Sequence, residues 1–172
     1  IAIGTETNGS ISCPSSINGI VGMKPTTGLV SRSGIIPISS SQDTAGPMGK
    51  SVYIVAKTLE VISGVDASDE ATLKIPIDFE FDFANATKNK RLDGVRFGLL
   101  NSEYSNSEIL DLHDQIRKIV SSLGGIVVDI EDNRTYPGDA EYYILLYEFR
   151  EGLESYLKNS ISAMKKLEDI IN

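Results

Sequence analysis

Apolar residues recur every three or four positions in several stretches of the chain, which is the spacing that one face of an α-helix requires. Residues 51–63 show this pattern, and Gly64 is suited to end the helix because glycine readily adopts the backbone conformation of a C-terminal cap. Residues 107–123 and 140–157 predict two further helices. Residues 160–171 are expected to continue as a helix.

Shorter apolar runs indicate β-strands. Residues 1–3 predict a buried strand that ends at Gly4. Residues 19–24 alternate glycine with apolar residues, which is consistent with a tightly packed central strand. Residues 28–30 and 35–37 predict short, irregular strands, and the glycines and prolines around them favour loops that line a pocket.

A strand–helix–strand succession follows in the second half of the chain. Residues 95–100 predict a buried strand, residues 107–123 a helix, and residues 126–130 the next strand. Such a succession predicts two parallel strands joined by a right-handed crossover. The pattern therefore favours an α/β fold.

Residues 65–90 are long, irregular and rich in acidic side chains. Phe79, Phe81 and Phe83 alternate with acidic residues in this stretch. We expect an extended arm that docks its three rings onto the core.

The turn after the first strand carries the candidate chemistry. Gly9 and Ser10 lie in it, and Pro14 suits the first turn of a short helix, where a proline sacrifices no hydrogen bond. A serine hydroxyl becomes a good nucleophile only when a base removes its proton. Acyl transfer also needs N–H donors aimed at the oxygen that becomes negative, and a Thr7–Ser10 turn can supply them. The alternative is a turn that only reverses the chain, because Gly, Asn and Ser favour turns for local reasons.

The continuation of the sequence favours the first interpretation. Residues 4–52 contain GTETNGSISCP, then GIVGMKPTTGLVSRSGIIP and SQDTAGPMGKSV. This run resembles the amidase signature family, whose members carry GTDTGGSIRxP, GxVGLKPTxGxVSRxGxxP and slDTxGP in the same order. Its residues at the motif positions are most similar to those of the peptide amidase branch. The resemblance implies a three-layer α/β/α fold with a mixed central sheet flanked by helices, of which this chain is one part.

The resemblance also implies roles for individual residues. Ser10 aligns with the nucleophilic serine of the family, and Thr7, Asn8, Gly9 and Ser10 align with the residues whose backbone N–H groups form its oxyanion hole. The family uses a Ser–Ser–Lys triad, in which a lysine is the base and a second serine relays the proton. Both precede the nucleophile in family members. We therefore expect this chain to be the middle of a longer enzyme and, by itself, to lack two of the three triad members.

Three positions depart from the family pattern. Glu6 replaces the usual aspartate, and Asn8 replaces the first glycine of GGS. Asparagine tolerates left-handed backbone angles better than most residues, so we expect the turn to survive. Ser12 stands where many members have arginine, which indicates a distinct substrate subgroup. Asp43 lies in a segment that helps to shape the nucleophile region in the family, and we expect its role to be structural.

By this resemblance, residues 1–172 form part of one amidase-signature domain. Residues 1–52 are its nucleophile segment, residues 53–92 a helix and a wrapping arm, and residues 93–172 the strand–helix–strand unit and further helices.

Composition excludes several classes of function. A net charge of −8 argues against a nucleic-acid surface, which needs clustered Lys and Arg. With one Cys and one His, the chain has no internal disulfide, and we expect neither a metal site nor a cofactor. No apolar run approaches the ~18 residues of a membrane span. No signal peptide is visible, and in part of a longer chain this absence means little. We expect a cytoplasmic protein with no membrane partner. The oligomeric state is left open.

Four other candidates are weaker. Residues 44–51 resemble the end of a phosphate-binding loop, but Thr44 stands where that motif needs glycine. His113 is expected to be a solvated helix residue and Lys24 a structural one. Cys13 has no cationic neighbour in sequence to activate a thiol, so we expect a small packed residue.

Three functions are compatible with the sequence. The first is a serine amidohydrolase that cleaves a carboxylic amide, such as a peptide C-terminal amide, through an acyl-enzyme intermediate. The second is the amidase-like component of a glutamyl-tRNA amidotransferase, which passes ammonia to a partner. The third is a truncated, non-catalytic scaffold.

Overall fold

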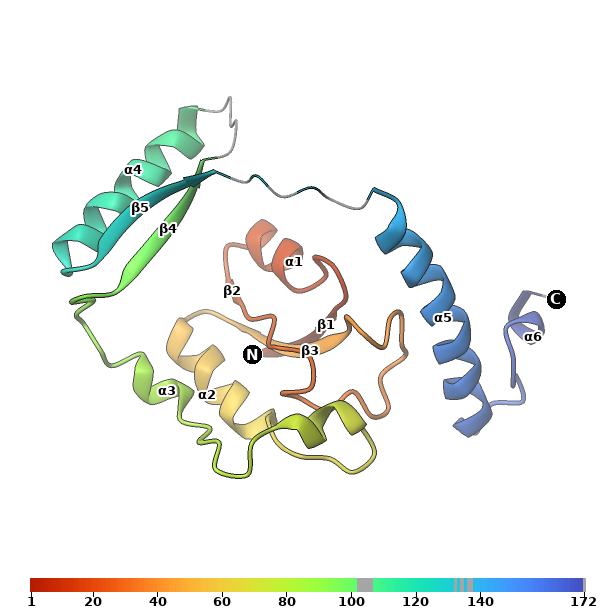
Figure 1. The fold of residues 1–172 in the computed structure, drawn as a ribbon. Helices are drawn as coiled ribbons and strands as arrows, with labels where there is room; N and C mark the ends of the chain where they lie inside the picture. Colours follow the sequence, from red (N-terminus) through yellow and green to blue (C-terminus); the bar gives the residue numbers. More distant parts are fainter. Residues whose placement is uncertain (102–106, 132, 134, 136–137, 172) are drawn as a thin grey trace. The chain divides into compact units, whose positions relative to one another are not determined.

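The computed structural model describes residues 1–101, 107–131, 133, 135 and 138–171 (Figure 1). The described residues fall into two compact units. The first contains residues 1–87 together with residues 137–172, and the second contains residues 88–136.

The first unit is built around a three-stranded antiparallel sheet with the strand order β1-β3-β2. Its strands are β1 (Ala2–Glu6), β2 (Val21–Gly22) and β3 (Thr44–Gly49). The strand predicted over residues 19–24 is confirmed in part by β2, but its predicted central position was wrong, because the central strand is β3. Strand β1 was predicted to be buried and to end at Gly4, but it continues to Glu6 and most of it is exposed.

Strand β3 could not be recognised from hydropathy because it reads TAGPMG. Proline cannot donate a ladder hydrogen bond and is rare in central strands. Here Pro47 pairs with Ile3, and its carbonyl oxygen accepts a hydrogen bond from the backbone N–H of Met23 at 3.0 Å. A Cβ on Gly46 would lie 2.0 Å from the backbone oxygen of Met23. Glycine at position 46 therefore lets the neighbouring backbone approach closely.

Between β2 and β3 the chain is irregular. The strands predicted over residues 28–30 and 35–37 are wrong. Val30 forms only an isolated bridge with Ser63, and residues 35–37 are in no strand. Val30 instead packs in the core of this unit, whose members are Val30, Ala45 and Leu59, with Leu29, Ile35, Ile62 and Phe83 packed against them.

Helix α1 (Ser12–Ile17) lies between β1 and β2 in the sequence, and helix α2 (Val52–Ile62) follows β3. Helix α1 has Pro14 in its first turn, as predicted. Helix α2 confirms the helix predicted over residues 51–63. Ser51 caps it by accepting a hydrogen bond from the N–H of Ile54.

The arm that follows contains the 3-10 helix η1 (Glu70–Lys74) and the short helix α3 (Phe83–Ala86). The three phenylalanine rings pack on one another, with centroids 5.1 to 6.3 Å apart. Phe83 packs against the core, whereas Phe79 is 40% exposed. The prediction that all three rings dock onto the core was thus only partly correct.

Helix α5 (Ala140–Asn159) confirms the helix predicted over residues 140–157. The continuous helix predicted over residues 160–171 is wrong, because only α6 (Glu168–Ile171) forms there. Ser160 has an extended backbone, and its hydroxyl accepts a hydrogen bond from the N–H of Ser162. Serine side chains compete in this way with the helical hydrogen bonds.

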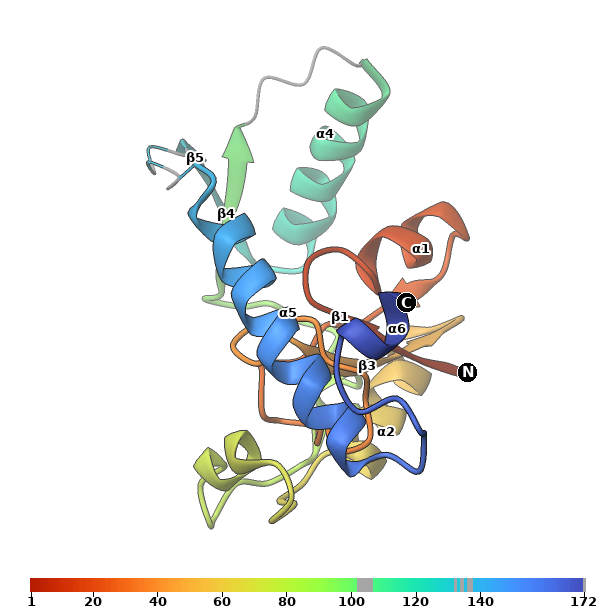
Figure 2. The same cartoon turned by 90° about the vertical axis from the view of Figure 1, so that its right-hand side faces the viewer.

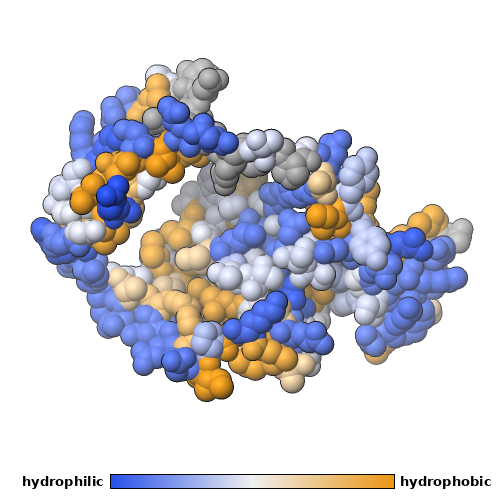
Figure 3. All heavy atoms as spheres, viewed as in Figure 1, coloured by the Kyte–Doolittle hydropathy of each residue, from blue (hydrophilic) through white to orange (hydrophobic). Residues whose placement is uncertain are grey.

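The second unit contains β4 (Arg96–Asn101), α4 (Ser107–Ser122) and β5 (Ile126–Glu131). The strands are parallel and α4 lies beside them, which confirms the predicted succession (Figure 2). Strand β4 was predicted to be buried, yet Leu100 is 36% exposed. Apolar side chains reach the surface of this unit (Figure 3).

Candidate active site

Ser10 lies in the turn between the end of β1 at Glu6 and the start of α1 at Ser12. Its side chain is exposed. Gly9 has φ +96°, a conformation that side chains other than that of glycine rarely adopt. The backbone oxygen of Gly9 accepts a hydrogen bond from the N–H of Cys13 at 2.8 Å, which starts the helix. The turn therefore presents the serine hydroxyl between a strand end and a helix start.

The buried carboxylate of Glu6 holds the helix side of this turn. It accepts hydrogen bonds from the backbone N–H groups of Ile11 and Ser12, both at 2.8 Å, and from the Ser12 hydroxyl at 3.1 Å. Burial raises the pKa of Glu6, but hydrogen bonds from Ser12, Gly9 and Ile11 outweigh burial and bring the pKa below its ordinary value. The glutamate in place of aspartate thus remains a charged acceptor for the turn.

A second buried carboxylate, Asp43, holds the other side of the turn. The Thr7 hydroxyl donates a hydrogen bond to Asp43 Oδ1 at 2.5 Å. Asp43 Oδ2 accepts hydrogen bonds from the backbone N–H groups of Ile38 and Ser39 at 2.8 and 2.9 Å. These contacts agree with the structural role expected for Asp43.

Helix α5 contributes two carboxylates that the sequence did not indicate. Asn8 Nδ2 donates a hydrogen bond to Glu141 Oε1 at 2.9 Å. Glu148 accepts hydrogen bonds from the Ser39 hydroxyl and from the N–H and hydroxyl of Ser41, the last two at 3.1 and 2.9 Å. The hydrogen bond from Ser39 is the main reason that the pKa of Glu148 lies below its ordinary value. No local pattern could have revealed these contacts, because their partners lie more than a hundred residues apart.

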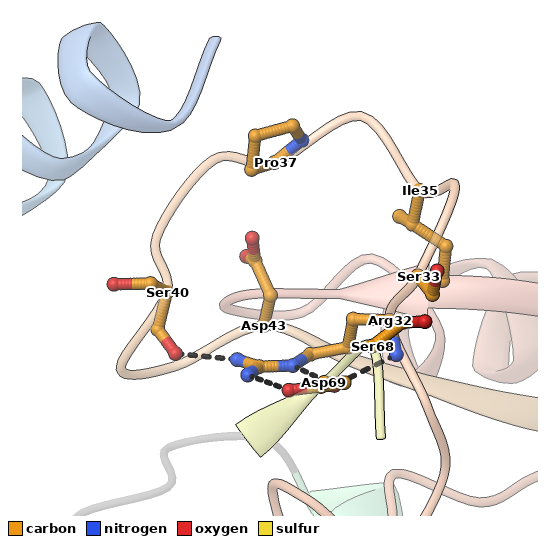
Figure 4. A pocket seen from close by; sticks show the side chains of 8 residues that line it. All are labelled: Arg32, Ser33, Ile35, Pro37, Ser40, Asp43, Ser68 and Asp69. Atoms are coloured by element: carbon orange, nitrogen blue, oxygen red, sulfur yellow. Dashed lines mark hydrogen bonds and ion pairs between the residues drawn. The ribbon is translucent and has the colours of Figure 1, made fainter. Parts of the chain in front are cut away.

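A cavity of about 190 Å³ borders Asp43 (Figure 4). It is lined by Arg32, Ser33, Ile35, Pro37, Ser40, Asp43, Ser68 and Asp69, and by none of residues 7–10. The Arg32 guanidinium donates from Nε and Nη2 to the two oxygens of Asp69, at 2.9 and 2.7 Å, and from Nη1 to the backbone oxygen of Ser40. Hydrogen bonds from Arg32 hold the pKa of Asp69 well below its usual range. The cation beside this cavity is thus already paired, and Asp43 is the lining residue that bonds to Thr7 of the Ser10 turn.

The other candidates are placed as follows. Cys13 is exposed, so the prediction of a packed cysteine was wrong. Lys24 is also exposed, and His113 is half-buried in α4. In the part of the chain that the structure describes, no three His, Cys, Asp or Glu side chains are grouped to hold a metal ion. Within the same residues, none of the helices combines the length and apolar character that crossing a membrane requires.

Comparison with known proteins gives consistent matches. A family model described as Amidase matches residues 1–172. The peptide amidase from Stenotrophomonas maltophilia is 44% identical and superimposes with a TM-score of 0.92, over 99% of this chain and 35% of that chain. An amidase family protein from Bacillus anthracis is 33% identical with a TM-score of 0.85, over 99% and 34%. One of the subunits of glutamyl-tRNA(Gln) amidotransferase from Tropheryma whipplei is 35% identical over 161 residues, which are 91% of this chain and 30% of that protein.

These matches confirm the amidase-signature α/β fold class and the likeness to peptide amidase. The chain spans about a third of the length of these relatives. Because the family model matches the chain from its first residue to its last, the chain belongs to the amidase signature family.

Proposed function

We propose that the protein is a serine amidohydrolase in which Ser10 attacks the carbonyl carbon of an amide. One observation carries this proposal: an exposed serine lies on a turn whose two ends are hydrogen-bonded to two buried carboxylates, Asp43 at Thr7 and Glu6 at Ile11. A nucleophile and its oxyanion donors need this kind of rigid support, because pre-oriented donors stabilise the developing charge without reorganisation.

The chemistry follows in two steps. The Ser10 oxygen bonds to the carbonyl carbon, and its proton leaves through the serine–lysine relay that the family resemblance implies. Backbone N–H groups of the Thr7–Ser10 turn stabilise the oxyanion. The Glu6 carboxylate accepts hydrogen bonds from the N–H groups of Ile11 and Ser12, and the N–H of Gly9 also helps to lower its pKa, so we assign the oxyanion role to the N–H groups of Thr7, Asn8 and Ser10. The amine or ammonia departs with the relayed proton, and water then hydrolyses the acyl-enzyme.

The proposed substrate is a carboxylic amide such as a peptide C-terminal amide. The support is the 44% identity to a peptide amidase, a protein that also binds the competitive inhibitor chymostatin. The Ser12 hydroxyl, at the position where many members have arginine, is bonded to Glu6 and so helps to build the turn.

A second candidate is an amidotransferase component that passes ammonia to a partner. The likeness to the Tropheryma whipplei protein, at 35% identity, favours it. An amidotransferase would release little ammonia until its partner proteins were added.

The test is covalent labelling of the full-length protein with a fluorophosphonate, together with measurement of ammonia released from a peptide amide. We expect Ser10→Ala to abolish both signals. Ser16→Ala removes an exposed hydroxyl on α1 and is the matched control, which should react like the unmodified protein. Because the base is a neutral lysine, acylation should also become faster toward alkaline pH.

Each other outcome has a definite meaning. An unmodified protein that takes no label at position 10 favours the non-catalytic scaffold. Equal labelling of Ser10→Ala and the unmodified protein assigns the nucleophile elsewhere. An acylation rate that stays flat from about pH 6 to 9 contradicts the lysine base.

A further inference from the structure

We propose that Asp43 is a positioning residue that acts on the oxyanion turn through Thr7. This inference rests on the proposed function, since it concerns the same turn. Thr7 and Asp43 lie 36 residues apart in the sequence, yet their side chains share a buried hydrogen bond of 2.5 Å. Thr7 is 9% exposed and Asp43 is 8% exposed.

The position of this pair in the sheet explains its geometry. Strands β1 and β3 pair antiparallel from Ala2↔Met48 to Glu6↔Thr44. The next opposed positions in this register are Thr7 and Asp43. The side-chain hydrogen bond therefore continues the ladder by one step beyond the last paired strand residues. It lies at the point where β1 ends and the nucleophile turn begins.

Several hydrogen bonds fix the orientation of Asp43, so its carboxylate can fix the position of the turn. Its second oxygen accepts the N–H groups of Ile38 and Ser39, and its own N–H donates to the Ser39 carbonyl oxygen at 2.8 Å. Ser39 has 0% exposure. A rotation of the Asp43 carboxylate toward another partner would break the two contacts that its second oxygen makes with the backbone.

The loop beneath Asp43 is in turn joined to distant elements. Glu148 on α5 accepts hydrogen bonds from Ser39 and Ser41, and Arg32 donates to the Ser40 carbonyl oxygen. Figure 4 shows Asp43 above the Arg32 guanidinium, on the loop that carries Ser40. The oxyanion turn is thus connected through Thr7, Asp43 and this loop to α5 and to the ion pair between Arg32 and Asp69.

This arrangement predicts an effect on rate that is separate from the effect on folding. Displacement of reacting groups by about 1 Å can slow a reaction on the order of a hundredfold. If Thr7 loses its hydroxyl, the turn remains connected to β1 but is no longer aligned by Asp43. Acylation of Ser10 should then be slower in molecules that are still folded.

The experiment measures the second-order rate constant for fluorophosphonate labelling of Ser10 in the full-length protein. Thr7→Val keeps the shape of the side chain and removes its donor, and we expect labelling about ten- to hundredfold slower per folded molecule. Thr7→Ser restores the hydroxyl and should recover most of the rate. Thr135→Val changes an exposed threonine outside the family motifs and should react like the unmodified protein.

A second variant keeps the proposal testable if Thr7→Val does not fold. Asp43→Asn weakens the acceptor of the Thr7 hydroxyl and should also slow labelling. In the double variant, Thr7→Val should add little to the effect of Asp43→Asn, because both substitutions act on the same hydrogen bond between Thr7 and Asp43. A Thr7→Val or Asp43→Asn protein that is less stable but is labelled at the normal rate per folded molecule overturns the proposal. Absence of label on the unmodified protein overturns the proposed function instead, and the inference with it.

Discussion

The region around Ser10 and the unit of residues 88–136 are stabilised in different ways. Around Ser10, hydrogen bonds join side chains to residues 36, 107 and 133 positions away in the sequence. The unit of residues 88–136 consists of two parallel strands and a helix in immediate succession. The first region depends on specific long-range polar contacts, whereas the second follows from a regular local pattern. This difference shows why a motif can indicate chemistry in a region whose structure it does not reveal.

Two ion pairs of the same type, one in each region, differ in how far their side chains are exposed to water. Arg32–Asp69 and Arg91–Asp93 are both two-pronged ion pairs. The side chains of the first pair are 17% and 7% exposed, and those of the second are 63% and 64% exposed. An exposed pair gains little because water screens its charges, whereas a buried one leaves an uncompensated charge when one partner is removed.

The largest effect is expected from adding one methyl group to a strand of each region. Gly46→Ala in β3 places a Cβ 2.0 Å from a backbone oxygen, which cannot move without separating β2 from β3. We expect a loss of about 3 kcal/mol or more in the free energy of unfolding. Gly98→Ala in β4 places a Cβ 3.0 Å from the flexible end of Ile130 and should cost less than about 1 kcal/mol.

Denaturant titration of the two full-length variants measures this difference. Similar losses in both proteins would show that β4 is packed as tightly as β3, and would contradict the contrast between the regions.

An intermediate effect is expected from neutralising one member of each ion pair. Asp69→Asn leaves Arg32 partly buried without its charged partner and should cost about 2 to 4 kcal/mol. Asp93→Asn at the exposed pair should change stability far less. Thermal or chemical denaturation of both variants checks the prediction, and a larger loss for Asp93→Asn would reverse our interpretation of burial.

The smallest effect concerns acid. The pKa values of Glu6, Asp69 and Glu148 lie below their ordinary values in the folded protein. At acidic pH the unfolded chain therefore binds more protons than the folded protein, and the free energy of unfolding decreases as the pH falls. The stabilisation is complete above the ordinary carboxyl values of 4.5 and 3.8 and is lost as the pH falls through the lower folded values. Glu6→Gln should therefore show a weaker loss of stability on acidification, measured by denaturation at a series of pH values. An unchanged pH dependence would mean that Glu6 titrates alike in both states.

Prediction from the sequence succeeded where neighbours in sequence are neighbours in space. Helices α2, α4 and α5 lie within about two residues of their predicted positions because their apolar periodicity is complete over each helix, and strands β4 and β5 do so because each contains a short apolar run. Strand β3 was missed since close backbone approach at Gly46 and pairing at Pro47 leave no periodic signal. The helix over residues 160–171 failed because the side chain of Ser160 binds the backbone.

By itself, the sequence determined the family and the candidate nucleophile, because the run from Gly4 to Val52 keeps the family's residues and spacing. Only the tertiary structure decided what holds Ser10 in place. Asp43, Glu141 and Glu148 reach the turn and its supporting loop through hydrogen bonds. The physical reason is that such bonds depend on the distance between atoms in space, and the folding of β1 against β3 and the placement of α5 set those distances.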